Sequence, residues 1–337
     1  MNVKHPFTLL GGLSAAEFMQ RYWQRKPLLV RQAIPAFSPL LSRAELFDLA
    51  AQPEVESRLV MGENQGQRDW SMQRGPFKRR EIPKLTERDW TLLVQGVDLH
   101  DDRVAALMQQ FRFVPDARLD DVMISYASDT GGVGPHFDSY DVFLLQAHGQ
   151  RRWRIGRQKD LSLVPDLPLK ILANFEPEHD YVLNPGDMLY LPPRYAHDGV
   201  AVGECMTYSV GFRVPQAGDL AREMLMRLSE GADDAAGADL YQDATQPAVV
   251  KPAAIPEAMQ DFAKSAMQRA LKDPLALPRA LGEYLTEPKA QVWFEASSTP
   301  RKLKSVRLDR RSRMMYDRHH VFLNGESWRA EIGRAHV

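Results

Sequence analysis

The chain has 337 residues, of which 44% are hydrophobic and 26% charged, and its formal net charge is −1. This balance excludes a general electrostatic attraction to nucleic acid or anionic membranes, so such a partner would need a local patch. The length predicts two or three domains, no run of about 18 apolar residues is present to span a membrane, and the single cysteine, Cys205, fits a reducing cytoplasm.

Residues 1–95 alternate between helix and strand signals. Ser14 with Glu17, and Ser42 with Glu45, have the spacing of capping boxes, so a helix is expected after each serine. Residues 27–30 predict a short strand between these helices, and residues 90–94 are interpreted as a further helix.

Residues 96–214 break into short β-rich runs separated by glycine and proline clusters. This pattern favours an all-β barrel or sandwich over βαβ units. The expected strands cover residues 122–126, 140–146, 151–155, 181–183, 188–191 and 205–212.

The last third of the chain becomes helical and then returns to β signals. Apolar residues at helical spacing predict helices over 219–229, 256–272 and 278–284, and 231–255 has the composition of a linker. Further strands are expected at 306–308 and 320–323, with a hairpin turn into another strand over 324–330. Residues 331–337 match one reading frame of a common sequencing adapter, so we expect a non-native tail and a natural protein that continues.

The strongest chemical signal is His136-Phe137-Asp138. Residues two apart on a strand point to the same face, so both side chains would reach one metal ion. His197, after Pro192-Pro193, is the candidate third ligand. Two histidines and one carboxylate form the facial triad of non-haem iron oxygenases, which leaves three coordination positions for a 2-oxo acid and oxygen. The alternative is a surface His-Asp pair with a hydrogen-bonded loop histidine.

A second signal is the strand Arg151-Arg152-Trp153-Arg154. Alternation places Arg151 and Trp153 on one face and the other two arginines on the opposite face. An arginine that points into a barrel needs an anion, and a guanidinium binds a carboxylate with two parallel hydrogen bonds. Arg151 is therefore a candidate anchor for a carboxylate ligand, the alternative being an exposed arginine at a strand edge.

Together these motifs resemble the Jumonji-C (JmjC) family of 2-oxoglutarate oxygenases, and most closely its bacterial ribosomal oxygenase branch. The resemblance covers the amino-terminal region and the barrel and weakens after about residue 215. The motifs that carry it are 121–126, 132–143, 151–154, 185–187 with 192–193, and 208–213.

The resemblance implies an α+β fold in which residues 96–214 form a double-stranded β-helix (a cupin-type jelly roll) and residues 1–95 elaborate it. It implies a helical dimerisation domain over 215–291, the start of a truncated winged helix over 292–330, and a homodimer. Iron(II) would be held by His136, Asp138 and His197, and 2-oxoglutarate by Arg151, which stands thirteen residues after Asp138 as in the family. With oxygen as the other co-substrate, the implied reaction is hydroxylation of an arginine in a large-subunit ribosomal protein.

Three functions stay open from the sequence alone. They are this arginine hydroxylase, a related oxygenase acting on another protein residue or on tRNA, and a non-catalytic cupin-type binding protein. Asp141 and Ser209 are candidate contacts for a basic target side chain. The basic segment 301–318 would contact ribosomal RNA or, alternatively, form a solvated charged face.

Overall fold

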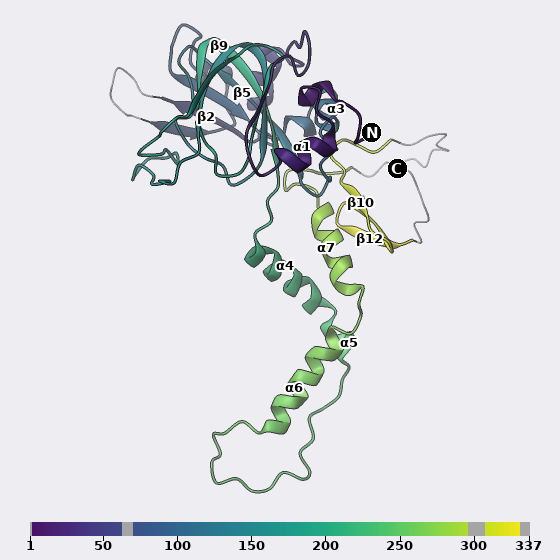
Figure 1. Cartoon of the computed structure of the whole chain (residues 1–337). Coiled ribbons are helices and arrows are strands. Elements are labelled where there is room, and N and C mark those ends of the chain that lie inside the picture. Colours follow the sequence, from purple (N-terminus) through teal and green to yellow (C-terminus); the bar gives the residue numbers. More distant parts are fainter. Residues whose placement is uncertain (1, 63–69, 296–306, 331–337) are drawn as a thin grey trace. The chain divides into compact units, whose positions relative to one another are not determined.

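The computed structural model describes residues 2–62, 70–295 and 307–330 of the chain (Figure 1). The chain divides into two compact units, residues 1–214 and residues 215–337. Among the residues that the structure describes, no helix has the length and apolar composition needed to cross a membrane.

An antiparallel sheet of nine strands forms the centre of the first unit, counted over its described residues. Eight strands follow the order β1-β8-β6-β9-β5-β4-β2-β3, and β7 pairs with the second half of β6. The strands are β1 (Leu28–Val30), β2 (Ser57–Met61), β3 (Ser71–Arg74), β4 (Trp90–Val94), β5 (Leu119–Ala127), β6 (Val142–Gly156), β7 (His179–Leu183), β8 (Met188–Leu191) and β9 (Ala196–Phe212).

The two longest strands, β6 and β9, pair along their whole length and hold the sheet together as it curves (Figure 1). β5 and β8 extend this pair on either side, β5 against β9 and β8 against β6. The two faces of this barrel-like sheet carry two main apolar cores, besides a small cluster of Ala127, Ala201 and Cys205. The smaller main core lies inside the curve and includes Leu144, Trp153 and Leu191.

The larger core lies between the outer face of the sheet and the helices of the first unit. It combines strand residues such as Phe143 and Tyr190 with Phe18 and Leu46 from helices. The helical elements are η1 (Thr8–Leu10), α1 (Ala15–Arg21), α2 (Arg43–Ala50), η2 (Arg79–Glu81), η3 (Val97–Leu99) and α3 (Asp102–Gln109).

The expected capping boxes begin α1 and α2. The Ser14 hydroxyl accepts a hydrogen bond from the Glu17 backbone N–H, and the Glu17 carboxylate accepts one from the Ser14 N–H in return. Ser42 and Glu45 repeat this exchange. The predicted short strand at 27–30 is also confirmed, as β1.

The helix expected over residues 90–94 is wrong, because these residues form β4, a strand between β2 and β5. All five residues are buried, and a short run of buried residues has no periodicity that separates strand from helix. β2, β3 and α3 were not expected, and the runs 140–146 and 151–155 are one continuous strand, β6.

The second unit contains four helices and a three-stranded antiparallel sheet in the order β10-β11-β12, counted over its described residues. The helices are α4 (Ala217–Glu230), α5 (Ala232–Ala236), α6 (Glu257–Ala270) and α7 (Ala276–Thr286), and the strands are β10 (Met314–Tyr316), β11 (His320–Leu323) and β12 (Glu326–Arg329).

The three helices expected from periodicity are confirmed, and α5 is an addition within the expected linker. The expected hairpin is confirmed, because Asn324 and Gly325 both have positive φ between β11 and β12. The strand expected over 306–308 is not seen at residues 307 and 308, and Val306 lies outside the described residues.

Close packing of α7 on the hairpin organises the second unit. Gly282 lies against the buried ring of Phe322, and the Thr286 hydroxyl accepts a hydrogen bond from the Gly325 N–H at 3.2 Å. A Cβ atom at position 282 would overlap the Phe322 ring, so this contact depends on glycine.

Gly282→Ala should therefore lower the free energy of unfolding by about 1–3 kcal/mol, as overpacking does in a filled core. Gly218→Ala is the matched control, because nothing lies within 4 Å of a Cβ added in α4 and alanine favours the helix. Urea titration followed by circular dichroism measures both. Equal stability of the two variants would contradict the packing described here.

Candidate metal and ligand site

His136 and His197 face each other across an isolated antiparallel bridge. The His136 N–H donates to the His197 carbonyl at 2.9 Å, and the His197 N–H donates back at 2.8 Å. His197 is the second residue of β9, whereas His136 and Asp138 lie in the connection between β5 and β6. The expectation that His136 and Asp138 share a regular strand is wrong. Gly134, at a φ of 77°, and Pro135 precede them, and neither favours a continuous ladder.

The backbone orients both imidazole rings. The Nδ1 atom of His136 lies 2.8 Å from the Gly134 carbonyl, and that of His197 lies 2.9 Å from the Tyr195 carbonyl. A carbonyl oxygen only accepts, so each Nδ1 carries a proton, and in the neutral imidazole Nε2 is then the atom with the free lone pair. This arrangement is typical of histidines that bind metals through Nε2.

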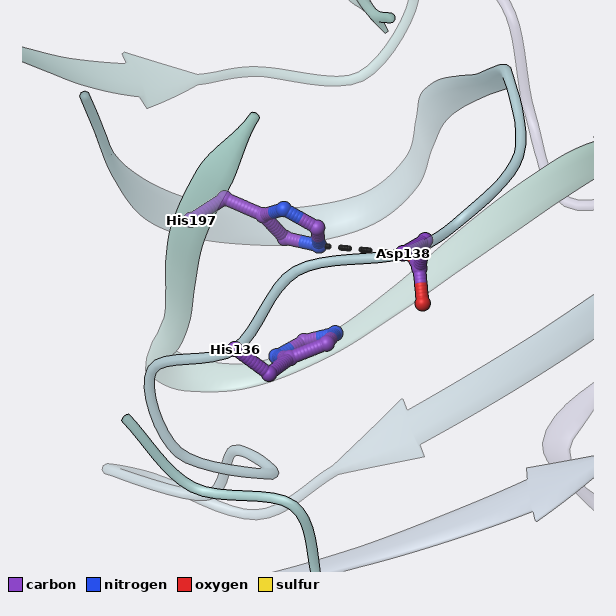
Figure 2. A group of neighbouring side chains, drawn as sticks. All are labelled: His136, Asp138 and His197. Atoms are coloured by element: carbon purple, nitrogen blue, oxygen red, sulfur yellow. Dashed lines mark ion pairs between the residues drawn. The ribbon is translucent and has the colours of Figure 1, made fainter. Parts of the chain in front are cut away.

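The three candidate ligands converge on one point (Figure 2). One ligand atom from each of His136, Asp138 and His197 lies within 4.8 Å of the others, and His197 Nε2 is 3.6 Å from Asp138 Oδ2. Burial and the neighbouring His136 lower the pKa of His197 to about 4, so its imidazole is neutral at pH 7. Neutral imidazoles and a carboxylate form a donor set that suits a divalent transition metal.

These three residues line a cavity of about 440 Å³ inside the curve of the sheet. Residues of β5, β6 and β9 supply much of its wall, together with residues of β2 and of the connecting segments. Besides the three candidate ligands and Trp153, the polar residues of the whole lining are Arg58, Gln95, Asp120, Asp121, Ser125, Tyr140, Arg151, Lys170, Thr207 and Ser209.

Arg151 is only 3% exposed and points into this cavity from β6. Its Nη1 donates to Ser125 Oγ at 3.1 Å and to Thr207 Oγ1 at 3.4 Å, and its Nη2 donates to the Gly199 carbonyl at 3.3 Å. Within the described part of the chain these neutral acceptors are its hydrogen-bond partners, and its Nε has none. A buried guanidinium without a carboxylate is costly, so the site favours an anionic ligand.

The other two arginines of this strand face outward, as strand alternation predicts. Arg152 forms an ion pair with Asp180 at 2.5 Å, and Arg154 forms one with Asp198 at 2.5 Å. The Trp153 side chain, two residues after Arg151, lines the cavity again. Its ring centroid lies 5.3 Å from the Arg151 guanidinium carbon and 5.8 Å from the His197 ring, so this indole is a common neighbour of the arginine and the histidine.

The two candidate substrate contacts occupy different environments. Ser209 lines the cavity from β9. Asp141 does not. Its fully buried carboxylate accepts hydrogen bonds from the Tyr190 hydroxyl at 2.6 Å and from Gln24 Nε2 at 3.0 Å, and pairs with Arg118 at 3.3 Å. The carboxylate therefore links β8 to the segments that follow α1 and precede β5 rather than facing a ligand, which corrects the expectation for Asp141.

Asp121, Met123 and Tyr140 are among the cavity residues that sequence reasoning did not single out. Asp121 and Met123 precede Ser125 at intervals of two, and this spacing could have placed them on one face of β5. Partial desolvation and the nearby negative charge of Asp138, to which its hydroxyl is hydrogen-bonded, raise the pKa of Tyr140. The tyrosine is therefore neutral at pH 7.

Comparison with known proteins places this architecture in a family. Residues 106–220 match the JmjC domain. The chain is 38% identical over 250 residues to the ribosomal protein uL16 3-hydroxylase of Escherichia coli, covering 73% of this chain and 65% of that protein. It is 38% identical over 206 residues to a probable ribosomal oxygenase of Haemophilus influenzae, covering 60% of this chain and 50% of that protein. The chain thus spans less than two thirds of the length of these two curated relatives.

A solved structure extends the match to most of the chain. YcfD, a ribosomal oxygenase from Escherichia coli in complex with cobalt and 2-oxoglutarate, superimposes with a TM-score of 0.73 and 32% identity. The match covers 94% of this chain and 85% of that one. The fold and the cavity define a JmjC-domain protein with a cupin-type β-sandwich. Within that class, the chain belongs to the bacterial ribosomal oxygenase family.

The placement of Asp141 predicts a structural effect. Asp141→Ala should lower the free energy of unfolding by about 3–5 kcal/mol, because it leaves Arg118 and Tyr190 without their buried acceptor. Asp180→Ala also removes an aspartate from an arginine, but at the surface, and should cost at most about 1 kcal/mol. Chemical unfolding measures both. An unchanged stability of Asp141→Ala, combined with weaker binding of a substrate peptide, would restore the original expectation.

Proposed function

We propose that this chain is an iron(II)- and 2-oxoglutarate-dependent oxygenase that hydroxylates an arginine side chain of a large-subunit ribosomal protein. The single observation that carries the proposal is the shared cavity. It combines a metal-type cluster of two histidines and an aspartate with a buried arginine that has no acidic partner within the described residues. The family membership and the similarity to the E. coli ribosomal oxygenase solved with cobalt and 2-oxoglutarate support the same conclusion.

In this proposal His136 Nε2, His197 Nε2 and a carboxylate oxygen of Asp138 hold the metal. The carbonyls of Gly134 and Tyr195 keep the rings in the required tautomer, so the ligand atoms are oriented before the metal arrives. Iron(II) with 2-oxoglutarate and oxygen supplies oxidative chemistry that inserts one oxygen atom into a C–H bond, with succinate and carbon dioxide as the other products.

Arg151 would bind the distal carboxylate of 2-oxoglutarate. Its bonds within the described residues use three of its five N–H groups, so donors remain for an anion. The apolar stem of the co-substrate would lie beside Trp153, which contacts both Arg151 and His197. Burial of the guanidinium strengthens such a charge-assisted pair.

An arginine substrate fits another part of the same cavity. Asp121 is buried and lines the wall, with Gln95 Nε2 donating to it at 2.7 Å, and Asp120, Met123 and Tyr140 lie in the same lining. Carboxylates and an aromatic ring suit a guanidinium, which pairs with anions and stacks on ring faces. Asp121 therefore takes the role that was expected of Asp141, and Ser209 remains a candidate contact.

The larger assembly is also part of the proposal. Residues 1–95 would elaborate the catalytic domain at 96–214, residues 215–291 would mediate a homodimer, and 292–330 would begin a winged helix, in a cytoplasmic protein. The expected non-native tail, 331–337, lies outside the described residues. So do residues 301–306 of the basic segment proposed to contact ribosomal RNA. Arg311 of that segment pairs with Asp309 and lies over the Phe294 ring.

The alternative targets are another protein residue or tRNA. The acidic lining beside Tyr140 favours a cationic side chain over an anionic nucleic-acid backbone. A non-catalytic binding protein is a weaker candidate, because such a protein has no need of an open metal site beside a buried carboxylate anchor.

The direct test is mass spectrometry of ribosomal protein uL16 after incubation with the chain, iron(II), 2-oxoglutarate and oxygen. We expect one added oxygen on an arginine and matching succinate. His136→Ala should reduce product at least about 100-fold, because removal of a ligand lowers metal affinity and activity steeply. His179→Ala, at an exposed histidine of β7 outside the cavity lining, is the control and should retain activity. Succinate without a modified peptide would keep the oxygenase and reject the substrate.

Asp121→Asn separates the substrate site from the co-substrate site. The amide keeps an oxygen for Gln95 but loses the negative charge, so the KM for the peptide should rise about tenfold, the size of one charged hydrogen bond. The KM for 2-oxoglutarate should not change. Asp129→Asn, whose carboxylate contacts Arg88 and the Gly203 N–H outside the cavity, is the control. An unchanged peptide KM in Asp121→Asn would remove this residue from the substrate site.

A further inference from the structure

Strand β6 exchanges its two faces part-way along its length. In its first half the even-numbered Val142 and Leu144 line the cavity, while Phe143 and Leu145 pack into the larger core. In its second half the odd-numbered Arg151 and Trp153 line the cavity. An uninterrupted strand would keep one parity throughout and would direct Arg151 away from the cavity.

A β-bulge causes the exchange. Gln146 lies opposite Thr207 on β9, but His148 lies opposite Met206, so β6 contains one extra residue between these two pairs. Such an insertion turns every following side chain to the other face. Gly149 completes the bulge at a φ of 60°, where an added Cβ would overlap the Glu204 carbonyl.

The side chain of Gln146 spans the bulge and reaches toward Arg151. Its Nε2 donates to the His148 carbonyl at 2.8 Å, and more weakly to the Gly149 carbonyl at 3.4 Å. Its Oε1 accepts from the Thr207 hydroxyl at 3.0 Å, and Thr207 Oγ1 in turn accepts from Arg151 Nη1 at 3.4 Å. Gln146 is fully buried and does not line the cavity.

We infer that Gln146 is a positioning residue for Arg151, holding the bulge that turns the arginine inward and orienting the Thr207 hydroxyl that receives its Nη1–H. The inference rests on the proposed function, since it gives Arg151 the distal carboxylate of 2-oxoglutarate as its ligand.

The direction of each hydrogen bond explains why an amide is suited to this place. A glutamine amide has both donors and an acceptor, so it can donate to the bulge carbonyls and accept from Thr207 at the same time. Because the Thr207 proton is committed to Gln146, its lone pair is presented to the guanidinium. Without the amide the hydroxyl would be free to turn its proton toward Arg151, and the arginine would lose a fixed acceptor.

The test compares two ligands on the cobalt(II)-loaded full chain by isothermal titration calorimetry. 2-Oxoglutarate has the distal carboxylate that Arg151 would bind, whereas oxalate chelates a metal but lacks that group. Gln146→Met should raise the Kd for 2-oxoglutarate about tenfold, the loss expected when one charged hydrogen bond is weakened, and leave the Kd for oxalate within about twofold. Gln150→Met is the matched control, because Gln150 is exposed on the same strand and bonds to Asn184.

A double-mutant cycle tests the route through Thr207. Thr207→Val should also raise the Kd for 2-oxoglutarate, and adding Gln146→Met to it should raise the Kd by a smaller factor than in the wild type, because the two changes interrupt one chain of hydrogen bonds while the contacts of Gln146 with the bulge do not involve Thr207. If Gln146→Met does not fold, Gln146→Leu replaces it. It also removes the amide without placing a charge at this buried position, and should show the same selective loss of 2-oxoglutarate.

The outcomes separate the inference from the proposed function. A wild-type chain that does not bind 2-oxoglutarate, or an Arg151→Met variant that binds it normally, would contradict the proposed function itself. If Arg151→Met loses 2-oxoglutarate but folded Gln146 variants bind it as the wild type does, the inference is overturned. An equal loss of oxalate and 2-oxoglutarate in the Gln146 variants would indicate general disruption of the site and would also overturn it.

Discussion

The antiparallel pairing of β6 with β9 carries most of the candidate site. Arg151 and Trp153 project from one strand, and His197, Thr207 and Ser209 from the other, all into the same cavity. Since backbone hydrogen bonds set the register of the two strands, they also set which side chains face each other. The bridge between His136 and His197 lies on the other edge of β9, because His197 also pairs with Ile155 of β6, and it places the two imidazoles 4.2 Å apart between ring centroids.

Burial affects the histidine and the arginine of this cavity in opposite ways. It favours neutral imidazole at His197, which is the form that binds a metal. Burial also makes the permanent charge of Arg151 energetically costly, because the hydroxyls and the carbonyl that the guanidinium contacts replace its lost hydration only in part. A bound metal ion would use the lone pair of the neutral imidazole. A carboxylate of a dicarboxylate co-substrate would neutralise the charge of the guanidinium. The electrostatics of the site and the family membership therefore favour the same chemistry.

Much of the local structure could be predicted from the sequence. The capping boxes at Ser14 and Ser42, the strand at 27–30 and the hairpin at Asn324-Gly325 each depend on a few adjacent residues, and all are present. The run at 90–94 was misassigned because it is buried on every side, which removes the alternation that identifies a strand. Asp141 was misplaced for a related reason, since only the packed fold shows that Tyr190, Gln24 and Arg118 surround it.

The sequence by itself determined the chemical identity of the site: which histidines and aspartate stand at ligand spacing, and which arginine follows at a fixed interval. Those features are local or come from the resemblance to the JmjC family, so they need no knowledge of the fold. Only the tertiary structure decided how the groups meet. The ligand loop lies outside a regular strand, a bulge between Gln146 and Gln150 reverses the facing of β6, and Asp121 rather than Asp141 reaches the cavity. These outcomes depend on register and packing between segments far apart in the chain, which no local pattern encodes.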